Sequence, residues 1–263
     1  MAKTIMLQAF KGGTAKSTST LEIATIMSKR GLKVLVVDLD PQNNLTQMVG
    51  INEVQRIEYS ITKTLMLKDD LKILRPSNKK FDIVTSDMTL AIYKSDLYKF
   101  SYGGDDQPKI PDYKKILKKQ LDKISNNYDF ILIDCPPSLD ILVELALNAS
   151  DYVYLPTQLE QLSVAGLDMN IQAIKAIIKS QNLKAQIKGI FFTIVENQRV
   201  LSTIIKEELT DLYGDLIIKT FIRKNVAICN AQYAFQSVTD YDPNSNGAND
   251  YRALTNIILK QIN

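Results

Sequence analysis

A short segment near the start of the chain carries residue types that together bind a chain of phosphates. Residues 10–18 read Phe-Lys-Gly-Gly-Thr-Ala-Lys-Ser-Thr. Glycines let backbone N–H groups approach anionic oxygens, a lysine neutralises the outer phosphates, and a hydroxyl beside that lysine ligates Mg²⁺. We therefore predict a nucleotide-binding loop with Ser17 as the metal ligand. Its candidate residues are Lys11, Gly12, Gly13, Thr14, Ala15, Lys16, Ser17 and Thr18.

Three aspartates follow apolar runs that read as buried strands. Asp38 and Asp40 come after the run 34–37, and Asp134 ends the run 130–134. Ligands of open α/β sheets bind at the carboxyl ends of strands, where carboxylates two residues apart point the same way. An aspartate that ends an apolar strand is also the Walker B arrangement, which orients Mg²⁺ through water. We expect Asp134 to take that role and the other two aspartates to face the phosphates.

The elements that must position these residues alternate between strands and helices. Apolar runs predict strands at 5–7, 34–37, 81–85, 130–134, 188–195 and 216–218, and a further strand within 150–160. Helical spacing predicts helices at 21–27, 90–100, 113–124, 203–212 and 250–262, and a long helix with a core stripe of Val164, Leu167, Ile171, Ile174 and Ile178. A glycine- and proline-containing loop is expected at 101–108. This alternation predicts a mostly parallel, doubly wound α/β sheet. Together with the phosphate-binding loop, it indicates the three-layer fold of P-loop NTPases.

Composition limits both the chemistry and the compartment. The chain has 263 residues, of which 45% are hydrophobic, and this suits one domain over residues 1–263. It contains no histidine and two cysteines, Cys135 and Cys229, which excludes histidine-based zinc sites and catalytic triads and fits a reducing cytosol. The formal net charge of +3 is mildly basic, so a nucleic-acid site must be a local patch. Because no signal peptide or membrane-length apolar run is present, we expect a cytoplasmic protein.

The phosphate-binding segment departs from the ordinary Walker A pattern and matches a variant of it. Phe10 and Ala15 stand at the glycine positions of G-x-x-x-x-G-K-[ST], whereas the segment fits K-G-G-x-x-K-S-T with an extra lysine, Lys11. This deviant Walker A loop resembles that of the ParA/MinD family of dimerising ATPases. The resemblance implies that Lys11 reaches the phosphates held by a second copy of the chain. The alternative interpretation is a glycine turn with two solvated lysines.

Two further motifs extend the resemblance. Residues 38–46 read D-L-D-P-Q-N-N-L-T, close to the family's switch sequence D-x-D-P-Q-x-N-x-[ST], and residues 128–139 are similar to its Walker B segment. The resemblance implies that Asp40 positions the hydrolytic water and that Asp38 supports it near the Mg²⁺ waters. Turn chemistry is the alternative reading of Asp-Pro-Gln-Asn-Asn. It does not account for paired aspartates at a strand end.

The resemblance becomes patchy after Ile222. Residues 221–226 read F-I-R-K-N-V where the family has V-I-P-R-N-V, a loop that contacts adenine, so Asn225 is the candidate base-binding residue. Arg223 replaces the family's proline, and residues 229–236 replace its usual S-E-A-P-S-x-G-K. Residues 241–248 then return to the family's Y-D-P-x-S-x-G-A.

Taken together, the motifs predict a slow, Mg²⁺-dependent ATPase that partitions DNA. The resemblance implies that two copies close on ATP, that this homodimer binds DNA without sequence preference, and that a ParB-like partner stimulates hydrolysis. Arg199, Arg223 and Lys224 are the candidate DNA-binding residues, because phosphate contacts need Lys or Arg. The protein would then be nucleoid-associated. The chain starts at its first strand, so no N-terminal helix-turn-helix is expected.

The sequence leaves two other functions open. The first is a cargo-positioning relative, such as a MinD-like membrane ATPase or a nucleoid-bound positioner. The helix at 250–262 carries only Arg252 and Lys260 as basic residues, so we expect it to pack onto the domain and not to bind a membrane. The second is a nucleotide-gated DNA-binding module with negligible hydrolysis, since the methyl of Ala15 stands close to where the phosphates would lie.

Overall fold

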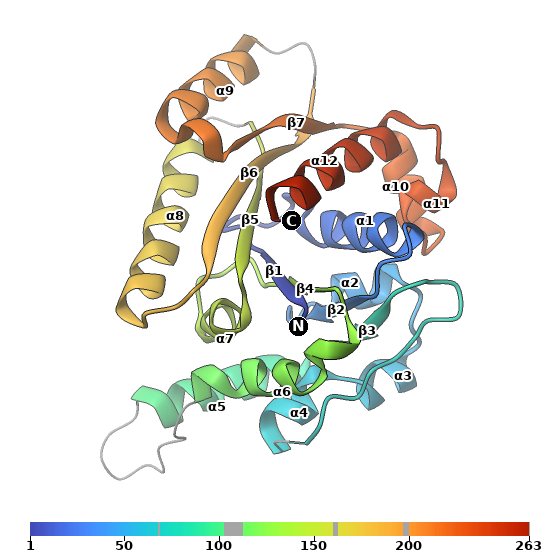
Figure 1. The fold of residues 1–263 in the computed structure, drawn as a ribbon, viewed down its shortest axis with the longest axis vertical. Coiled ribbons are helices and arrows are strands. Elements are labelled where there is room, and N and C mark those ends of the chain that lie inside the picture. Colours follow the sequence, from blue (N-terminus) through green and yellow to red (C-terminus); the bar gives the residue numbers. More distant parts are fainter. Residues whose placement is uncertain (68, 103–112, 160–162, 197–199, 263) are drawn as a thin grey trace.

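A seven-stranded sheet forms the centre of the computed structural model, which describes residues 1–67, 69–102, 113–159, 163–196 and 200–262 (Figure 1). The strand pairs are parallel, and their order is β3-β2-β4-β1-β5-β6-β7. The strands are β1 (Lys3–Leu7), β2 (Val34–Asp38), β3 (Asp82–Val84), β4 (Phe130–Asp134), β5 (Tyr152–Thr157), β6 (Gln186–Val195) and β7 (Ile217–Arg223). The predicted doubly wound α/β sheet is therefore confirmed.

Helices cover both faces of this sheet and make the fold three-layered (Figure 1). One core packs beneath α1, α2, α10, α11 and α12, and the other beneath α4 to α9. The α-helices are α1 (Lys16–Lys29), α2 (Asn44–Met48), α3 (Glu53–Glu58), α4 (Ile61–Leu67), α5 (Thr89–Tyr102), α6 (Ile116–Ile124), α7 (Ile141–Ala149), α8 (Ser163–Ser180), α9 (Val200–Tyr213), α10 (Val226–Tyr233), α11 (Val238–Tyr241) and α12 (Asn246–Ile262). Short 3₁₀ turns lie at Tyr113–Lys115, Ser125–Asn127 and Gly214–Leu216.

The strand order places the functional motifs at one edge of the sheet. β1 lies between β4 and β5, so the order of the strands reverses at β1, and ligands of such sheets bind at this point. In the β1–β4 and β2–β4 registers, Leu7 and Asp38 both pair with Asp134. The phosphate-binding loop and the two strand-end aspartates therefore meet at the same carboxyl edge.

Continuous apolar runs explain why the central strands lie where they do. Every residue of β2 and β4 is buried, as expected for parallel strands covered by helices on both faces. In α8, the predicted stripe is confirmed at Leu167, Ile171 and Ile174, which are buried in the core. Ile178 is half-buried, and the side chain of Val164 lies outside the described residues.

The structure differs from the sequence prediction mainly in the C-terminal third and in residues 51–67. β7 is longer than the predicted 216–218, because it is an edge strand in which the exposed Lys219 interrupts the apolar run. Helix α10 carries no clear apolar stripe and was not predicted, and neither were the short helices α3 and α4. Of the loop predicted at 101–108, residues 101 and 102 end α5, and residues 103–108 lie outside the described residues.

The final helix packs into the domain. Leu254, Ile258 and Ile262 of α12 are buried against the face of the sheet that α1 covers, which confirms that this helix packs onto the domain. In the described parts of the chain, no helix is long and apolar enough to cross a membrane. The apolar face of α12 is thus used for packing.

Candidate nucleotide-binding site

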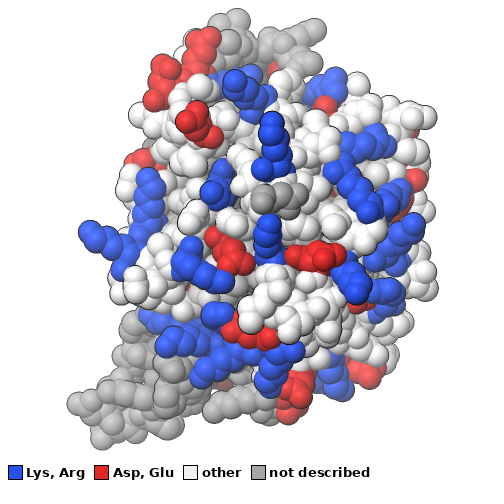
Figure 2. All heavy atoms as spheres, viewed as in Figure 1, with Lys and Arg blue, Asp and Glu red and all other residues white. Residues whose placement is uncertain are grey.

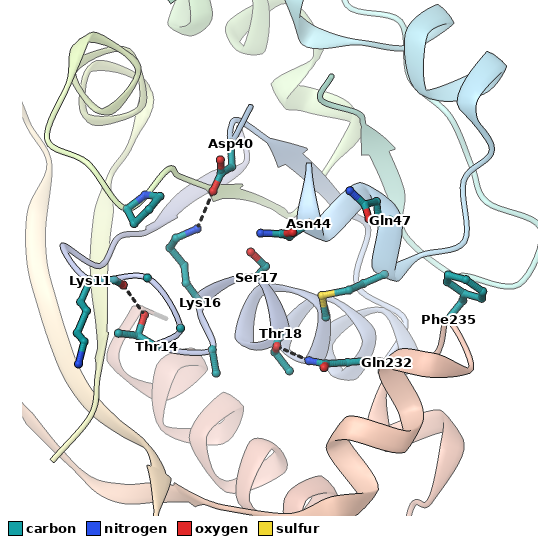
Figure 3. Close-up of a pocket in the computed structure, with 15 residues that line it drawn as sticks. Lys11, Thr14, Lys16, Ser17, Thr18, Asp40, Asn44, Gln47, Gln232 and Phe235 are labelled. Atoms are coloured by element: carbon teal, nitrogen blue, oxygen red, sulfur yellow. Dashed lines mark hydrogen bonds and ion pairs between the residues drawn. The ribbon is translucent and has the colours of Figure 1, made fainter. Parts of the chain in front are cut away.

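The predicted phosphate-binding loop forms the floor of a pocket at the end of β1. The pocket has a volume of about 430 Å³ and runs from the loop past Asp40 to the far side of α1 (Figure 3). Its lining residues are Lys11, Gly12, Gly13, Thr14, Ala15, Lys16, Ser17, Thr18, Asp40, Asn44, Gln47, Met48, Pro137, Gln232 and Phe235. All eight residues predicted for the loop therefore line one cavity.

Two side chains from neighbouring strands hold the loop in place. The Nε2 amide of Gln158, which follows β5, donates to the carbonyl of Gly13 at 2.7 Å. The hydroxyl of Thr193 in β6 donates to the carbonyl of Thr14 at 3.0 Å. These bonds secure two loop carbonyls from the β5 and β6 side. The sequence motif alone did not identify either supporting residue.

Ala15 adopts a left-handed backbone conformation at the start of α1. Its φ is 55° and its ψ is 29°, and it occupies the N-cap position. An L residue in this region is strained by contact between Cβ and the backbone, whereas glycine is not. The carbonyl of Ala15 nevertheless accepts from the N–H of Ser19 at 2.8 Å, so the first turn of α1 forms normally. The loop thus takes the conformation that a glycine would favour.

We expect Ala15→Gly to raise the free energy of unfolding by about 1 kcal/mol, because it removes the left-handed strain. Urea unfolding of the purified protein measures this change. Ala24→Gly, the same exchange within the regular part of α1, is the control and should lower stability by about 1 kcal/mol or more. A destabilised Ala15→Gly variant would contradict the strain argument.

Lys16 is a buried cation between two carboxylates. Its Nζ lies 3.0 Å from Oδ1 of Asp134 and 3.9 Å from Oδ2 of Asp40, and the side chain is 7% exposed. Burial alone would lower the pKa of Lys16, but the charges of Asp134 and Asp40 and the hydrogen bond to Asp134 raise it overall. The ammonium group therefore keeps its charge at the floor of the pocket, where it can neutralise an anionic ligand.

Asp40 faces the pocket from the loop after β2. Its Oδ1 accepts from the N–H of Gln42 at 2.9 Å, and its Oδ2 points towards Lys16 (Figure 3). Burial raises the pKa of Asp40, and the Gln42 N–H and the charge of Lys16 offset part of this rise. A carboxylate of raised basicity, fixed at one oxygen and directed into the pocket by the other, can orient a water molecule and accept its proton.

Asp134 has an unsatisfied oxygen beside the loop. Its Oδ1 accepts from Lys16 and from the hydroxyl of Thr20, whereas its fully buried Oδ2 finds no hydrogen-bond partner within the described ranges. An orphaned buried carboxylate oxygen has a high cost unless a cation or its bound water occupies the position next to it. Asp134 contacts Lys16, which lines the pocket together with Ser17. A hydroxyl plus one carboxylate suits Mg²⁺, which keeps several waters and needs no full protein cage. The residues present thus fit that ion.

Asp38 has a different environment from the one predicted. It is fully buried, its Oδ2 accepts from the N–H and the hydroxyl of Thr46 at 2.9 and 2.7 Å, and its Oδ1 accepts from the N–H of Asp40. Burial, reinforced by the nearby charge of Asp134, raises the pKa of Asp38 to about 7. These contacts do not support a metal-facing role. They indicate that Asp38 fixes the 38–46 segment, and thereby Asp40, in position.

The end of the pocket furthest from Lys16 is formed by residues that the motifs did not identify. Gln232 and Phe235, from α10 and the turn after it, lie there (Figure 3), and Met48 of α2 also belongs to the pocket lining. The predicted base-binding residue Asn225 lies outside this lining. Its Oδ1 accepts from the N–H of Ala227 at 2.8 Å and caps α10. The structure therefore gives Asn225 a helix-capping contact and leaves base binding by it a prediction.

Two of the three predicted DNA-binding residues, Arg223 and Lys224, lie next to carboxylates in the structure. The guanidinium of Arg223 makes two contacts with the carboxylate of Asp250 in α12, at 2.9 and 2.5 Å, which tie the end of β7 to that helix. The Nζ of Lys224 lies 2.8 Å from Glu196, although its side chain is 66% exposed. Arg199 lies outside the described residues. The structure therefore shows Arg223 in a contact that joins β7 to α12, and DNA binding by Arg223 stays a prediction.

Glu22 links the loop helix α1 to the C-terminal helices. Its carboxylate accepts from the N–H of Val238 at 2.5 Å and from the N–H and hydroxyl of Thr239 at 3.2 and 2.8 Å, which caps α11. Burial raises the pKa of Glu22 to about 7, although these three hydrogen bonds lower it in part. The link matters for the site because the segment before α11 carries Gln232 and Phe235.

We expect the free energy of unfolding to fall as the pH rises from about 5 to about 7, by an amount on the order of 2 kcal/mol. The folded-state pKa of Glu22, about 7, exceeds its ordinary value of 4.5, so the folded protein binds more protons in this window. Asp38 contributes in the same direction, and the absence of histidine keeps the window free of the usual titrating side chain. Urea unfolding across this range should show a smaller slope for Glu22→Gln, and an unchanged slope for the exposed control Glu58→Gln. An equal slope in both variants would contradict the assignment.

These features define a class of protein. A strand, a glycine-containing loop and a helix that presents Lys16 and Ser17, with Asp134 at the end of the adjacent strand, make up the site of a P-loop nucleotide-binding protein with an α/β fold. A model of the family described as an AAA domain matches residues 2–188.

Two curated relatives and one solved structure narrow this class. The chain is 31% identical to the sporulation initiation inhibitor protein Soj of Bacillus subtilis, over 95% of this chain and 96% of that protein. It is also 31% identical to the chromosome-partitioning ATPase Soj of Treponema pallidum, over 98% of each. The structure of a putative plasmid partition protein from Borrelia burgdorferi, bound to AMPPNP, superposes with a TM-score of 0.78 at 26% identity and covers 99% of this chain and 100% of that one. The chain belongs to the ParA/Soj family of partitioning ATPases.

Proposed function

We propose that this chain binds and slowly hydrolyses ATP with Mg²⁺ and uses the nucleotide to control DNA binding during partitioning. The observation that carries the proposal is the group formed by Lys16, Asp134 and Asp40, in which the buried Asp134 Oδ2 lacks a partner among the described residues. The Borrelia relative is described with AMPPNP, and the Treponema relative is described as an ATPase, which supports the choice of nucleotide.

The residues of the site then have separate roles in binding and hydrolysis. Backbone N–H groups of residues 12–18 and the Nζ of Lys16 would hold the phosphates, and Ser17 and Asp134 would hold Mg²⁺. The metal ion supplies neutralising charge for the phosphates. Asp40 orients the attacking water and receives its proton, while Asp38 keeps the 38–46 segment in place through Thr46.

The surface around Lys11 supports assembly of two copies on ATP. The side chain of Lys11 points away from Lys16 and Asp40 of its own pocket (Figure 3). Beside it lies a second hollow of about 290 Å³, which is lined by Phe10, Leu167 and Asn170 among others. Phe10 is 45% exposed, and Met169, on the same end of α8, is 63% exposed. Exposed apolar side chains next to a hollow favour an interface with another protein. If a second copy packs against this surface, Lys11 would reach the phosphates that the second copy holds.

DNA binding would use the dimer's surface lysines and arginines. Figure 2 shows Lys and Arg spread across the viewed face, with blue side chains gathered near the lower edge, where Figure 1 places α6. Lys118 and Lys123 of α6 pair with Asp122 and Asp70 in exposed ion pairs, which cost little to exchange for DNA phosphates. With Arg223 bound to Asp250, we propose Lys224 and this α6 face as the DNA contacts, together with Arg199. A ParB-like partner and a nucleoid-associated, cytoplasmic location follow from the same function.

A DNA shift assay tests this function. With ATP and Mg²⁺, we expect the protein to retard duplexes of unrelated sequence equally, and the affinity to fall steeply as salt rises. Without nucleotide, or with Lys16→Ala, the shift should be lost. A shift that is equal with and without ATP would contradict nucleotide control, and a shift of one sequence alone would contradict binding without sequence preference.

A further inference from the structure

The far end of the nucleotide pocket has the chemistry of a base-binding site. The loop end is cationic and polar, whereas the other end combines an aromatic ring and an amide, from Phe235 and Gln232, and the thioether of Met48 also lines the pocket. Figure 3 shows Phe235 and Gln232 on the side of α1 away from Lys11, beyond Ser17 and Thr18. A nucleotide whose phosphates lie against the loop would extend its base towards these residues.

Phe235 is held at the pocket with a strained backbone and a largely exposed ring. Its φ is 54°, in the left-handed region, and its side chain is 52% exposed. Its N–H donates to the carbonyl of Gln232, its carbonyl accepts from the Nζ of Lys79, and Gly50 packs against its Cβ. A non-glycine residue with positive φ persists only where its surroundings enforce it, and such residues cluster at ligand sites. The strained backbone therefore holds an aromatic ring in an exposed position beside the pocket.

Gln232 has one half of its amide fixed. Its Nε2 donates to the hydroxyl of Thr18 at 2.8 Å, which joins α10 to the first turn of the loop helix (Figure 3). This bond orients the amide and leaves its Oε1 as an acceptor. An exocyclic amine, which adenine carries at position 6, donates to such an oxygen, whereas guanine presents an acceptor at the same position.

We propose that Phe235 stacks on the base of the bound nucleotide and that Gln232 accepts from its exocyclic amine, so that these two residues select adenine. This inference rests on the proposed function, because it takes ATP as the occupant of the pocket. It assigns base recognition to α10 and the turn after it, in place of the predicted Asn225.

The first test separates base binding from phosphate binding. Phe235→Gly removes the ring, while glycine accepts the positive φ, so the variant is expected to fold. Its Kd for ATP should rise about tenfold, as expected for loss of one stacking contact, while its Kd for inorganic tripolyphosphate stays unchanged. Phe235→Trp should keep wild-type affinity for ATP. The control is Tyr233→Ala, which removes a neighbouring aromatic ring that is 88% exposed and lies outside the pocket lining.

The second test measures the selectivity of the site for adenine over guanine. Gln232→Leu keeps the size of the side chain but removes the acceptor, so we expect the Kd for ATP to rise about fivefold and that for GTP to stay constant. A calorimetric titration with both nucleotides measures this ratio.

The outcomes separate the inference from the proposed function. Unchanged ATP affinity in Phe235→Gly, equal losses for ATP and tripolyphosphate, or an unchanged ATP-to-GTP ratio in Gln232→Leu would overturn the base-site inference while leaving the function intact. A wild-type protein that binds neither ATP nor tripolyphosphate would overturn the proposed function and this inference with it.

Discussion

Lys16→Ala is expected to weaken ATP binding by about 100-fold, because it removes a charge-assisted contact to the phosphates from the buried floor of the pocket. The residue is 7% exposed, and its Nζ contacts two carboxylates that would otherwise repel the ligand. Removing it leaves Asp134 and Asp40 as uncompensated negative charges in the same space. Isothermal titration with ATP and Mg²⁺ measures the loss.

The matched control is Lys118→Ala, which removes a lysine from an exposed ion pair on α6. It should leave the Kd for ATP within about twofold of wild type, since surface pairs contribute little. Urea unfolding establishes that both variants fold. Equal ATP affinities for Lys16→Ala and Lys118→Ala would show that the P-loop pocket is not the nucleotide site.

Asp40→Asn is expected to lower the rate of ATP hydrolysis by about 100-fold or more, the usual contribution of a positioned base. Asparagine has the same shape, and its Oδ1 can still accept from the N–H of Gln42, so the local fold should persist. Because the exchange removes a negative charge near the phosphates, the Kd for ATP should stay constant or fall. Turnover is measured as phosphate release at saturating ATP.

The exposed residue Asp122 provides the control for this exchange, since Asp122→Asn removes a carboxylate from α6, outside the pocket lining. Its rate should match that of the wild type. An Asp40→Asn variant with wild-type turnover would remove Asp40 from the catalytic role and leave the water to another group. A variant that lost ATP binding as well would instead show that Asp40 supports the pocket itself.

Local sequence was enough to group the predicted phosphate-binding residues, because they are neighbours in the chain. The eight loop residues and Asp40 line one pocket, and Asp134 contacts Lys16 at its floor, because parallel strands end at the same edge of the sheet. Alternation of apolar runs with helical spacing was likewise enough to predict the doubly wound sheet. Each of these inferences depends on residues close together in sequence or on a general rule of sheet topology.

The base end of the site was missed because it depends on contacts between distant segments. Gln232 reaches the pocket through a hydrogen bond to Thr18, which lies more than 200 positions earlier in the chain. Phe235 reaches it through a turn whose left-handed residue is a phenylalanine, which no turn rule predicts. These two residues fall within 229–236, where the family pattern breaks off.

The same reason explains why the contacts of Asp38 and Arg223 could not be predicted from the sequence. The sequence shows that Asp38 lies at a strand end near the phosphate site. It does not show that the N–H and hydroxyl of Thr46 donate hydrogen bonds to the Oδ2 of Asp38. It shows a basic residue at 223, but not that Asp250 of the last helix meets its guanidinium. Burial and pairing of a charge are set by the tertiary fold, so residue type alone could not assign these functions.

Closure of two copies around ATP is the step on which the proposed partitioning function depends. Light scattering of the wild-type protein at saturating AMPPNP and Mg²⁺ tests it most directly. We predict that the molar mass doubles on addition of the analogue, and that Lys11→Ala, which keeps its own pocket, remains a monomer. A wild-type protein whose mass does not change, while calorimetry shows AMPPNP bound, would contradict the account.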